Sequence, residues 1–126
     1  MTSQLGLQSF DFQPRTRVLF GPATISHLGE LAREVGGERA ILVSDPGIQA
    51  AGHVDKAIES LEAASIRTVL YKGVEENPTT RHVEEALKIA RNHRTDLVIG
   101  LGGGSSMDCA KGMNFLITNG GRMADY

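Results

Sequence analysis

The sequence predicts an α/β fold in which a parallel sheet carries helices on both faces. Three short apolar or β-rich runs, at 40–43, 66–74 and 95–104, alternate with stretches that have apolar residues at helical spacing. Short continuous apolar runs are typical of strands buried on both faces, and alternation of strands with helices is typical of parallel βαβ units. Right-handed crossovers then place helices on both faces of the sheet.

The N-terminal part is expected to form a short β-hairpin before the parallel sheet. Two apolar runs, Phe10–Phe12 and Arg17–Gly21, flank a turn that contains a proline, which favours an antiparallel pair. The next segment, at 22–37, has apolar residues at helical spacing and closes with two glycines, as helices often do.

Three further helices are expected between and after the strands. Residues 46–65 show helical spacing in their second part, from Val54 to Leu61. The segment 77–94 begins with Thr79 or Thr80 as a possible cap and continues with an apolar stripe. A last helix is expected over 105–118, and residues 119–126 are expected to form a loop.

Composition narrows the class of protein. The chain has 126 residues, which suits one domain, and a net charge of -2 without any basic block, so nucleic acid is not expected as a partner. No apolar run approaches the roughly 18 residues that cross a membrane, and we find no signal peptide. The single cysteine, Cys109, rules out an internal disulfide framework, suits a reducing cytoplasm, and is expected in the core.

A glycine run follows the third predicted strand and predicts an anion site. Residues 102–106 read Gly-Gly-Gly-Ser-Ser at the carboxyl end of a parallel strand, where open α/β sheets bind ligands. Glycine allows a ligand to approach the main chain closely. Ser105 is a candidate N-cap with Asp108 in a capping-box position, and the first helical turn would attract a phosphate or pyrophosphate.

Asp45 and Asn77 follow the other two predicted strands. Asp45 can accept hydrogen bonds from the ribose hydroxyls of an adenosine, and its charge would repel a 2′-phosphate. The alternative is an ordinary turn or helix-capping aspartate before a proline and a glycine, and the residues alone leave both open. For Asn77 a plain turn and helix start is favoured.

Together these segments resemble the iron-containing (group III) alcohol dehydrogenase family. The resemblance runs from Phe10 to Tyr126 and is carried by "RVLFGPATISHLGEL", "LVSDPGIQAAG", "VEENPT" and above all "GGGSSMDCAKG". It implies a Rossmann-like NAD(P)-binding α/β domain, and an enzyme that interconverts an alcohol with an aldehyde or ketone. Residues matching Gly102, Gly103, Gly104 and Ser105 contact the pyrophosphate in that family, and the residue matching Asp45 faces the ribose.

The resemblance also implies a cofactor preference and further site residues. An acidic residue at the position of Asp45 implies NAD in preference to NADP, and Asn77 is implied to lie nearby. Ser106 and Asp108 complete the expected cofactor-binding set. A homo-oligomer in the cytoplasm is expected, with a small alcohol or aldehyde as the substrate of the complete enzyme.

Family members are roughly three times longer, so 1–126 is expected to be a truncated N-terminal cofactor domain. The helical domain with the Fe²⁺ or Zn²⁺ ligands is expected to be missing, and the chain alone is expected to be inactive. The four histidines have no metal-ligand spacing and are expected on the surface or on helix faces: His27, His53, His82 and His93.

Several alternatives remain open from the sequence. The same glycines and Asp45 would serve a non-catalytic nucleotide-binding fragment equally well. A glycerol dehydrogenase or a dehydroquinate synthase-like enzyme shares the architecture but fits the glycine motif less well. Lys111 either pairs with Asp108 one helical turn earlier or reaches the cleft, and the structural role is favoured.

Overall fold

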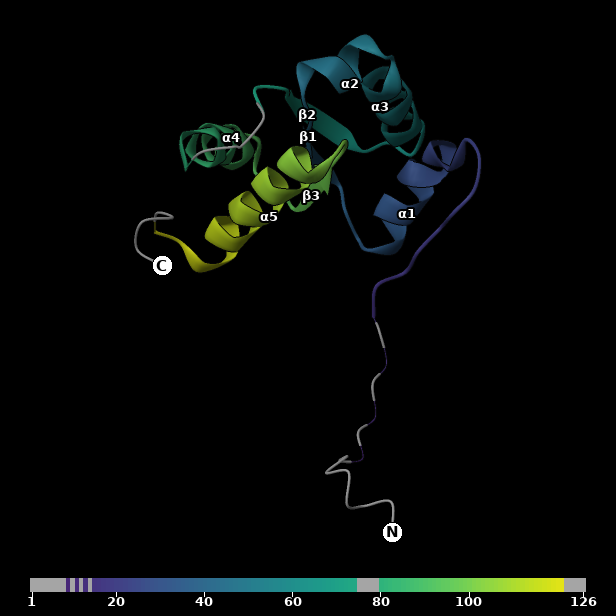
Figure 1. Cartoon of the computed structure of the whole chain (residues 1–126), viewed down its shortest axis with the longest axis horizontal. Helices are drawn as coiled ribbons and strands as arrows, with labels where there is room; N and C mark the ends of the chain where they lie inside the picture. Colours follow the sequence, from purple (N-terminus) through teal and green to yellow (C-terminus); the bar gives the residue numbers. More distant parts are fainter. Residues whose placement is uncertain (1–8, 10, 12, 14, 75–79, 122–126) are drawn as a thin grey trace.

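The computed structural model shows a three-stranded parallel sheet with helices on both faces (Figure 1). It describes residues 9, 11, 13, 15–74 and 80–121. The strands run side by side in the order β2-β1-β3. Their bounds are Arg39–Val43 for β1, Arg67–Tyr71 for β2 and Leu97–Gly100 for β3. The predicted α/β class and the alternation of strands with helices are therefore confirmed.

The helices of the described residues comprise five α-helices and one 3-10 turn. Their bounds are Thr24–His27 (η2, the 3-10 turn), Leu28–Glu34 (α1), Pro46–Ala50 (α2), His53–Ala63 (α3), Thr80–His93 (α4) and Gly104–Asn119 (α5). The single helix expected over 22–37 is thus η2 followed by α1, and α2 is an additional short helix. None of these helices is long and apolar enough to cross a membrane.

The central strand β1 supplies core residues to both faces of the sheet. Ile41 and Val43 pack with residues of α4 and α5, whereas Ala40 and Leu42 pack on the side of α1 and α3. All four side chains are fully buried. Since successive strand residues point to opposite faces, only a strand covered on both sides needs an uninterrupted apolar run.

The helices α1 and α3 cross at very close range. The backbone N–H of Gly29 donates to Ser60 Oγ at 2.9 Å, and a Cβ on Gly29 would lie 2.1 Å from the Ser60 carbonyl oxygen. Ser60 Oγ in turn donates to the carbonyl of Ser26 at 2.9 Å. The absence of a side chain at Gly29 is therefore what lets the two helices pack.

The predicted N-terminal hairpin is not found in the described residues. The run Arg17–Gly21 forms no strand, and it leads away from the sheet in Figure 1. Val18 and Phe20 are 79% and 95% exposed. Apolar residues alone do not make a strand, because each strand needs a partner for its backbone hydrogen bonds. The other half of the prediction, Phe10–Phe12, lies largely outside the described residues.

Candidate functional site

The carboxyl ends of β1 and β3 lie side by side at the point where the direction of the chain connections changes. The two strands are neighbours, with Val43 paired to Gly100, yet β1 leads towards α3 on one face and β3 leads to α5 on the other. Open parallel sheets bind ligands at such a topological switch point. Asp45 follows β1 and the glycine run follows β3, so the fold brings both to this switch point.

Asp45 contacts both the following helix and the glycine run. Its Oδ1 accepts the N–H of Ile48 at 2.9 Å and so caps α2. Its Oδ2 accepts a hydrogen bond from Ser106 Oγ at 3.4 Å, which is a long distance for such a bond. The capping role that the sequence left as an alternative is present, together with a contact to the predicted phosphate loop.

The three glycines have different surroundings. Gly102 has φ +138°, and a Cβ there would lie 3.1 Å from both Asp45 Oδ2 and Ser106 Oγ. A Cβ on Gly103 or Gly104 would meet no atom within 4 Å. Gly102 is therefore needed for internal packing, whereas the backbone at 103–104 is open to an approaching ligand.

The prediction that Ser105 is the N-cap is wrong, because α5 begins at Gly104 and its N-cap lies two residues before Ser105. Gly103 is the N-cap, with φ -86° and ψ -163°, and no side chain caps the helix. Ser105 and Asp108 therefore lie inside α5 and form no capping box. The first backbone N–H groups of the helix have no acceptor within it and point outward with the positive end of the helix dipole. This leaves them available to an anion, as at other helix N-termini.

Two fully buried serines connect the segment that follows β1 to the segment that follows β3. Ser44 Oγ donates to the carbonyl of Leu101 at 2.8 Å, and Leu101 N–H donates to the carbonyl of Val43 at 2.9 Å. Ser106 is the second buried serine and contacts Asp45. The sequence analysis missed Ser44, although a serine directly after an apolar strand was a usable signal.

For two of the remaining predicted residues, Asp108 and Lys111, the described structure shows no side-chain hydrogen bond to Asp45 or to the glycine run. Asn77 lies outside the described residues. Asp108 and Lys111 are exposed, and none of the ion pairs found in the described part of the chain joins them. Cys109 is fully buried, as predicted, and this burial raises the pKa of its thiol to about 11.

The described residues contain no metal site. No three side chains among their histidines, cysteines, aspartates and glutamates lie close enough together to hold an ion. His27 and His53 are exposed and His93 is half-buried. His82 is 3% exposed on the inner side of α4, so for this residue the helix-face alternative holds and the surface alternative does not.

A topological switch point, with a glycine run after one strand and an aspartate after the neighbouring strand, is the ligand-binding arrangement of doubly wound α/β proteins. A sequence profile described as "Iron-containing alcohol dehydrogenase" matches residues 14–126. The chain belongs to this family.

Several of the similar proteins are named as alcohol or diol dehydrogenases. Alcohol dehydrogenase 4 of Schizosaccharomyces pombe is 41% identical over 108 residues, or 86% of this chain. NADH-dependent butanol dehydrogenase B of Clostridium acetobutylicum is 37% identical over 102 residues, or 81% of this chain. The crystal structure of a 1,3-propanediol oxidoreductase superposes on 94% of this chain with a TM-score of 0.86 and 37% identity.

The chain is much shorter than these relatives. It covers 26% of the length of each of the two dehydrogenases and 31% of the crystallised oxidoreductase. The comparison therefore concerns one region of the family, and the activity of the whole proteins does not transfer directly to this chain.

Proposed function

We propose that this chain is the nucleotide-binding part of an NAD-dependent alcohol dehydrogenase. In this proposal residues 1–126 act as a cofactor domain and depend on a helical metal-binding domain outside them. The observation that carries the proposal is the meeting of Asp45 with the Gly102–Ser106 loop at the switch point. The name of the butanol relative, which includes NADH, supports the choice of cofactor.

Different residues at the switch point bind different parts of the dinucleotide. The open backbone at Gly103 and Gly104, with the N–H groups that begin α5, binds the pyrophosphate. Asp45 accepts hydrogen bonds from the adenosine ribose and disfavours a 2′-phosphate by charge repulsion. Ser106 is buried and acts through Asp45, whose carboxylate it orients. The roles of Asn77 and Asp108 stay predictions.

The chain supplies binding and orientation, whereas the bound NAD would exchange hydride with a small alcohol or aldehyde. The described residues do not fit the metal that the family name implies. We therefore assign no metal-dependent step to them, and we expect the chain alone not to oxidise short alcohols with NAD. Turnover by the purified chain would contradict this division of work.

Titration calorimetry with NAD and NADP tests the cofactor assignment. The useful variant is Asp45→Asn, because its side-chain oxygen still caps α2 while the negative charge is lost. We expect NAD to bind the wild type more tightly than NADP. In the variant we expect NAD affinity to fall about tenfold, which corresponds to one charge-assisted hydrogen bond, and the preference over NADP to narrow.

The control is Asp55→Asn, which removes a charge from an exposed position on α3. It should leave both affinities unchanged. Absence of binding by either dinucleotide would remove the cofactor claim for this chain. An unchanged preference in Asp45→Asn would remove the claim for Asp45.

A further inference from the structure

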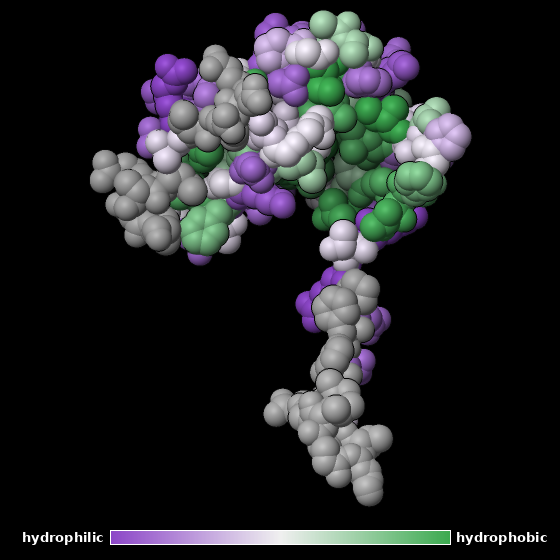
Figure 2. Space-filling model, viewed as in Figure 1, coloured by the Kyte–Doolittle hydropathy of each residue, from purple (hydrophilic) through white to green (hydrophobic). Residues whose placement is uncertain are grey.

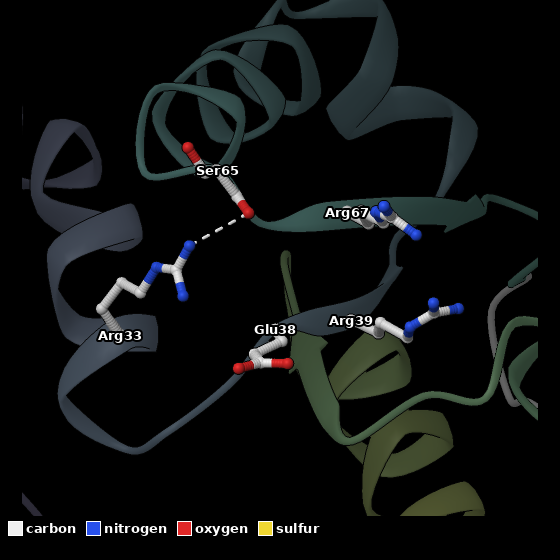
Figure 3. A pocket seen from close by; sticks show the side chains of 5 residues that line it. All are labelled: Arg33, Glu38, Arg39, Ser65 and Arg67. Carbon is white, nitrogen blue, oxygen red and sulfur yellow. Dashed lines mark hydrogen bonds between the residues drawn. The ribbon is translucent and has the colours of Figure 1, made fainter.

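A polar pocket lies beside the amino ends of β1 and β2, at the opposite end of the strands from Asp45. Its volume is about 320 Å³, within the range of small-molecule sites. Figure 3 shows its lining residues, three of which are arginines: Arg33, Glu38, Arg39, Ser65 and Arg67. The proposed cofactor site, formed by Asp45 and residues 102–106, shares no residue with this pocket.

Arg39 and Arg67 stand directly opposite each other on neighbouring strands. They are register partners in the parallel pair of β1 and β2, so their side chains leave the same side of the sheet. Figure 3 shows the two guanidinium groups one above the other and pointing the same way. Like charges in this position destabilise a sheet unless something neutralises them.

The hydrogen bonds of the pocket leave one guanidinium group uncommitted. Arg39 Nη1 donates to the carbonyl of His93 at 3.3 Å. Arg33 donates to the carbonyls of Ala64 and Ser65 at 2.7 and 3.1 Å, where α3 ends. The ring of His93 contacts the Arg67 carbonyl oxygen at 3.1 Å, but within the described residues no hydrogen bond or ion pair involves the Arg67 guanidinium.

The nearby acidic groups do not neutralise both arginines. The Glu38 carboxylate points away from the guanidinium groups of Arg39 and Arg67 in Figure 3. The Asp96 carboxylate accepts the backbone N–H groups of Glu38 and Arg39 at 2.9–3.2 Å and also attracts the Arg39 charge. The pair therefore retains positive charge that a dianion would offset.

We propose that this pocket binds a phosphate group of a small molecule between Arg39 and Arg67. The planar guanidinium fork matches the geometry of phosphate oxygens, and a phosphate ester carries nearly two negative charges. A single carboxylate would offset only one of the two arginines. Arg33 adds positive charge from the helix side of the pocket.

Amide NMR on the 126-residue chain tests this site directly, with pyrophosphate as the probe at constant ionic strength. We expect saturable shifts of the amides at 38, 39 and 65–67. The variant Arg67→Gln should weaken this binding about tenfold or more, since a charge-assisted contact is lost. Arg67→Lys keeps the charge but loses the fork and should bind with intermediate affinity. Arg91→Gln, an exposed arginine of α4 outside the pocket, should bind like the wild type.

The same spectra separate this site from the glycine loop. Any shifts at 102–106 report pyrophosphate binding to the proposed cofactor site and should persist in Arg67→Gln. A melting experiment in low salt adds a second readout: Arg67→Gln should melt higher than the wild type without pyrophosphate and gain less when it is added. No shift at the pocket amides, or equal weakening in Arg67→Gln and Arg91→Gln, would overturn the proposal.

Discussion

Gly102 and Gly103 are neighbours in the sequence, but they meet opposite requirements. Gly102 lies in a backbone region that side chains rarely adopt, and a side chain there would press against Asp45 and Ser106. Gly103 has an ordinary extended conformation and faces open space. Gly102 is therefore needed for packing around Asp45, whereas Gly103 leaves space for a ligand to approach the backbone.

This difference predicts opposite outcomes for two matched substitutions. Gly102→Ala should lower the free energy of unfolding by about 1–3 kcal/mol, because the strained backbone and the close contacts must both be accommodated. Gly103→Ala should cost at most about 1 kcal/mol, because alanine is a poorer N-cap than glycine but meets no atom nearby. It should nevertheless weaken NAD binding about tenfold, because the methyl group occupies the space left for the pyrophosphate.

Denaturant unfolding and calorimetry on both variants measure the two effects separately. Unchanged NAD affinity in Gly103→Ala would show that the open side of the loop does not face the ligand. A Gly102→Ala variant as stable as the wild type would contradict the packing described around Asp45.

At the scale of elements, the contact between α1 and α3 depends on a single missing side chain. Gly29→Ala places a methyl carbon 2.1 Å from the Ser60 carbonyl oxygen, so the helices must move apart. We expect a loss of about 1–3 kcal/mol in the free energy of unfolding, the usual cost of overpacking. Thermal or urea unfolding measures it, with Gly103→Ala as the control. A Gly29→Ala variant of wild-type stability would mean that the helices do not cross so closely.

Asp96 joins the amino ends of β3 and β1 and makes this connection sensitive to pH. Its Oδ1 accepts the N–H groups of Glu38 and Arg39 at 3.0 and 2.9 Å. Burial tends to raise the pKa of Asp96, but these backbone hydrogen bonds and the Arg39 charge outweigh it. The pKa therefore falls below its ordinary value of 3.8.

When folding lowers the pKa of a carboxyl group, that group stabilises the folded state at pH values above its unfolded-state pKa. That contribution is lost as the pH falls through the folded-state value. We therefore expect Asp96→Asn to reduce stability at pH 7 by at most about 1 kcal/mol, because the side chain is exposed. Urea unfolding should show this difference beginning to shrink as the pH falls below about 4 and vanishing once the pH is below the folded-state pKa. A difference that persists at pH 2 would assign the effect to something other than the charge.

At the scale of the whole molecule, the outer edge of β3 is open in the described structure. β3 pairs with β1 alone among the described strands. A groove of about 440 Å³ lies beside it and is lined by residues of β3 and α5, including Met107, which is 44% exposed. Figure 2 shows apolar side chains at the surface between α5 and α1. Open strand edges with apolar surroundings favour association.

We therefore predict that the 126-residue chain associates as its concentration rises and melts at low temperature. Gel filtration over a concentration series measures the association. Met107→Gln should reduce it, whereas Val35→Gln, which changes an exposed residue beyond the end of α1, should not. A monomer at all concentrations with a sharp melt at high temperature would contradict the prediction.

The sequence predicted the parts of this fold that depend on local patterns. The apolar run at 40–43 marked a strand buried on both faces, and the order of elements gave the parallel sheet. Asp45 and the glycine run each follow a strand of the predicted parallel sheet, so both could be expected at its carboxyl edge. The structure added the strand order that makes β1 and β3 neighbours. Family membership followed from the glycine motif for the same reason: the motif is contiguous in the chain.

Contacts between distant residues were decided by the tertiary structure. The bond from Ser44 to Leu101, the contact of Ser106 with Asp45 and the paired arginines at 39 and 67 join segments far apart in the sequence. The predicted hairpin and the Ser105 cap failed because local composition cannot show whether a strand has a partner or at which residue a helix starts. The sequence by itself determined the class of fold and the candidate residues at the carboxyl edge of the sheet, Asp45 and the glycine run. Only packing decided which glycine supports the fold and which one is open to a ligand.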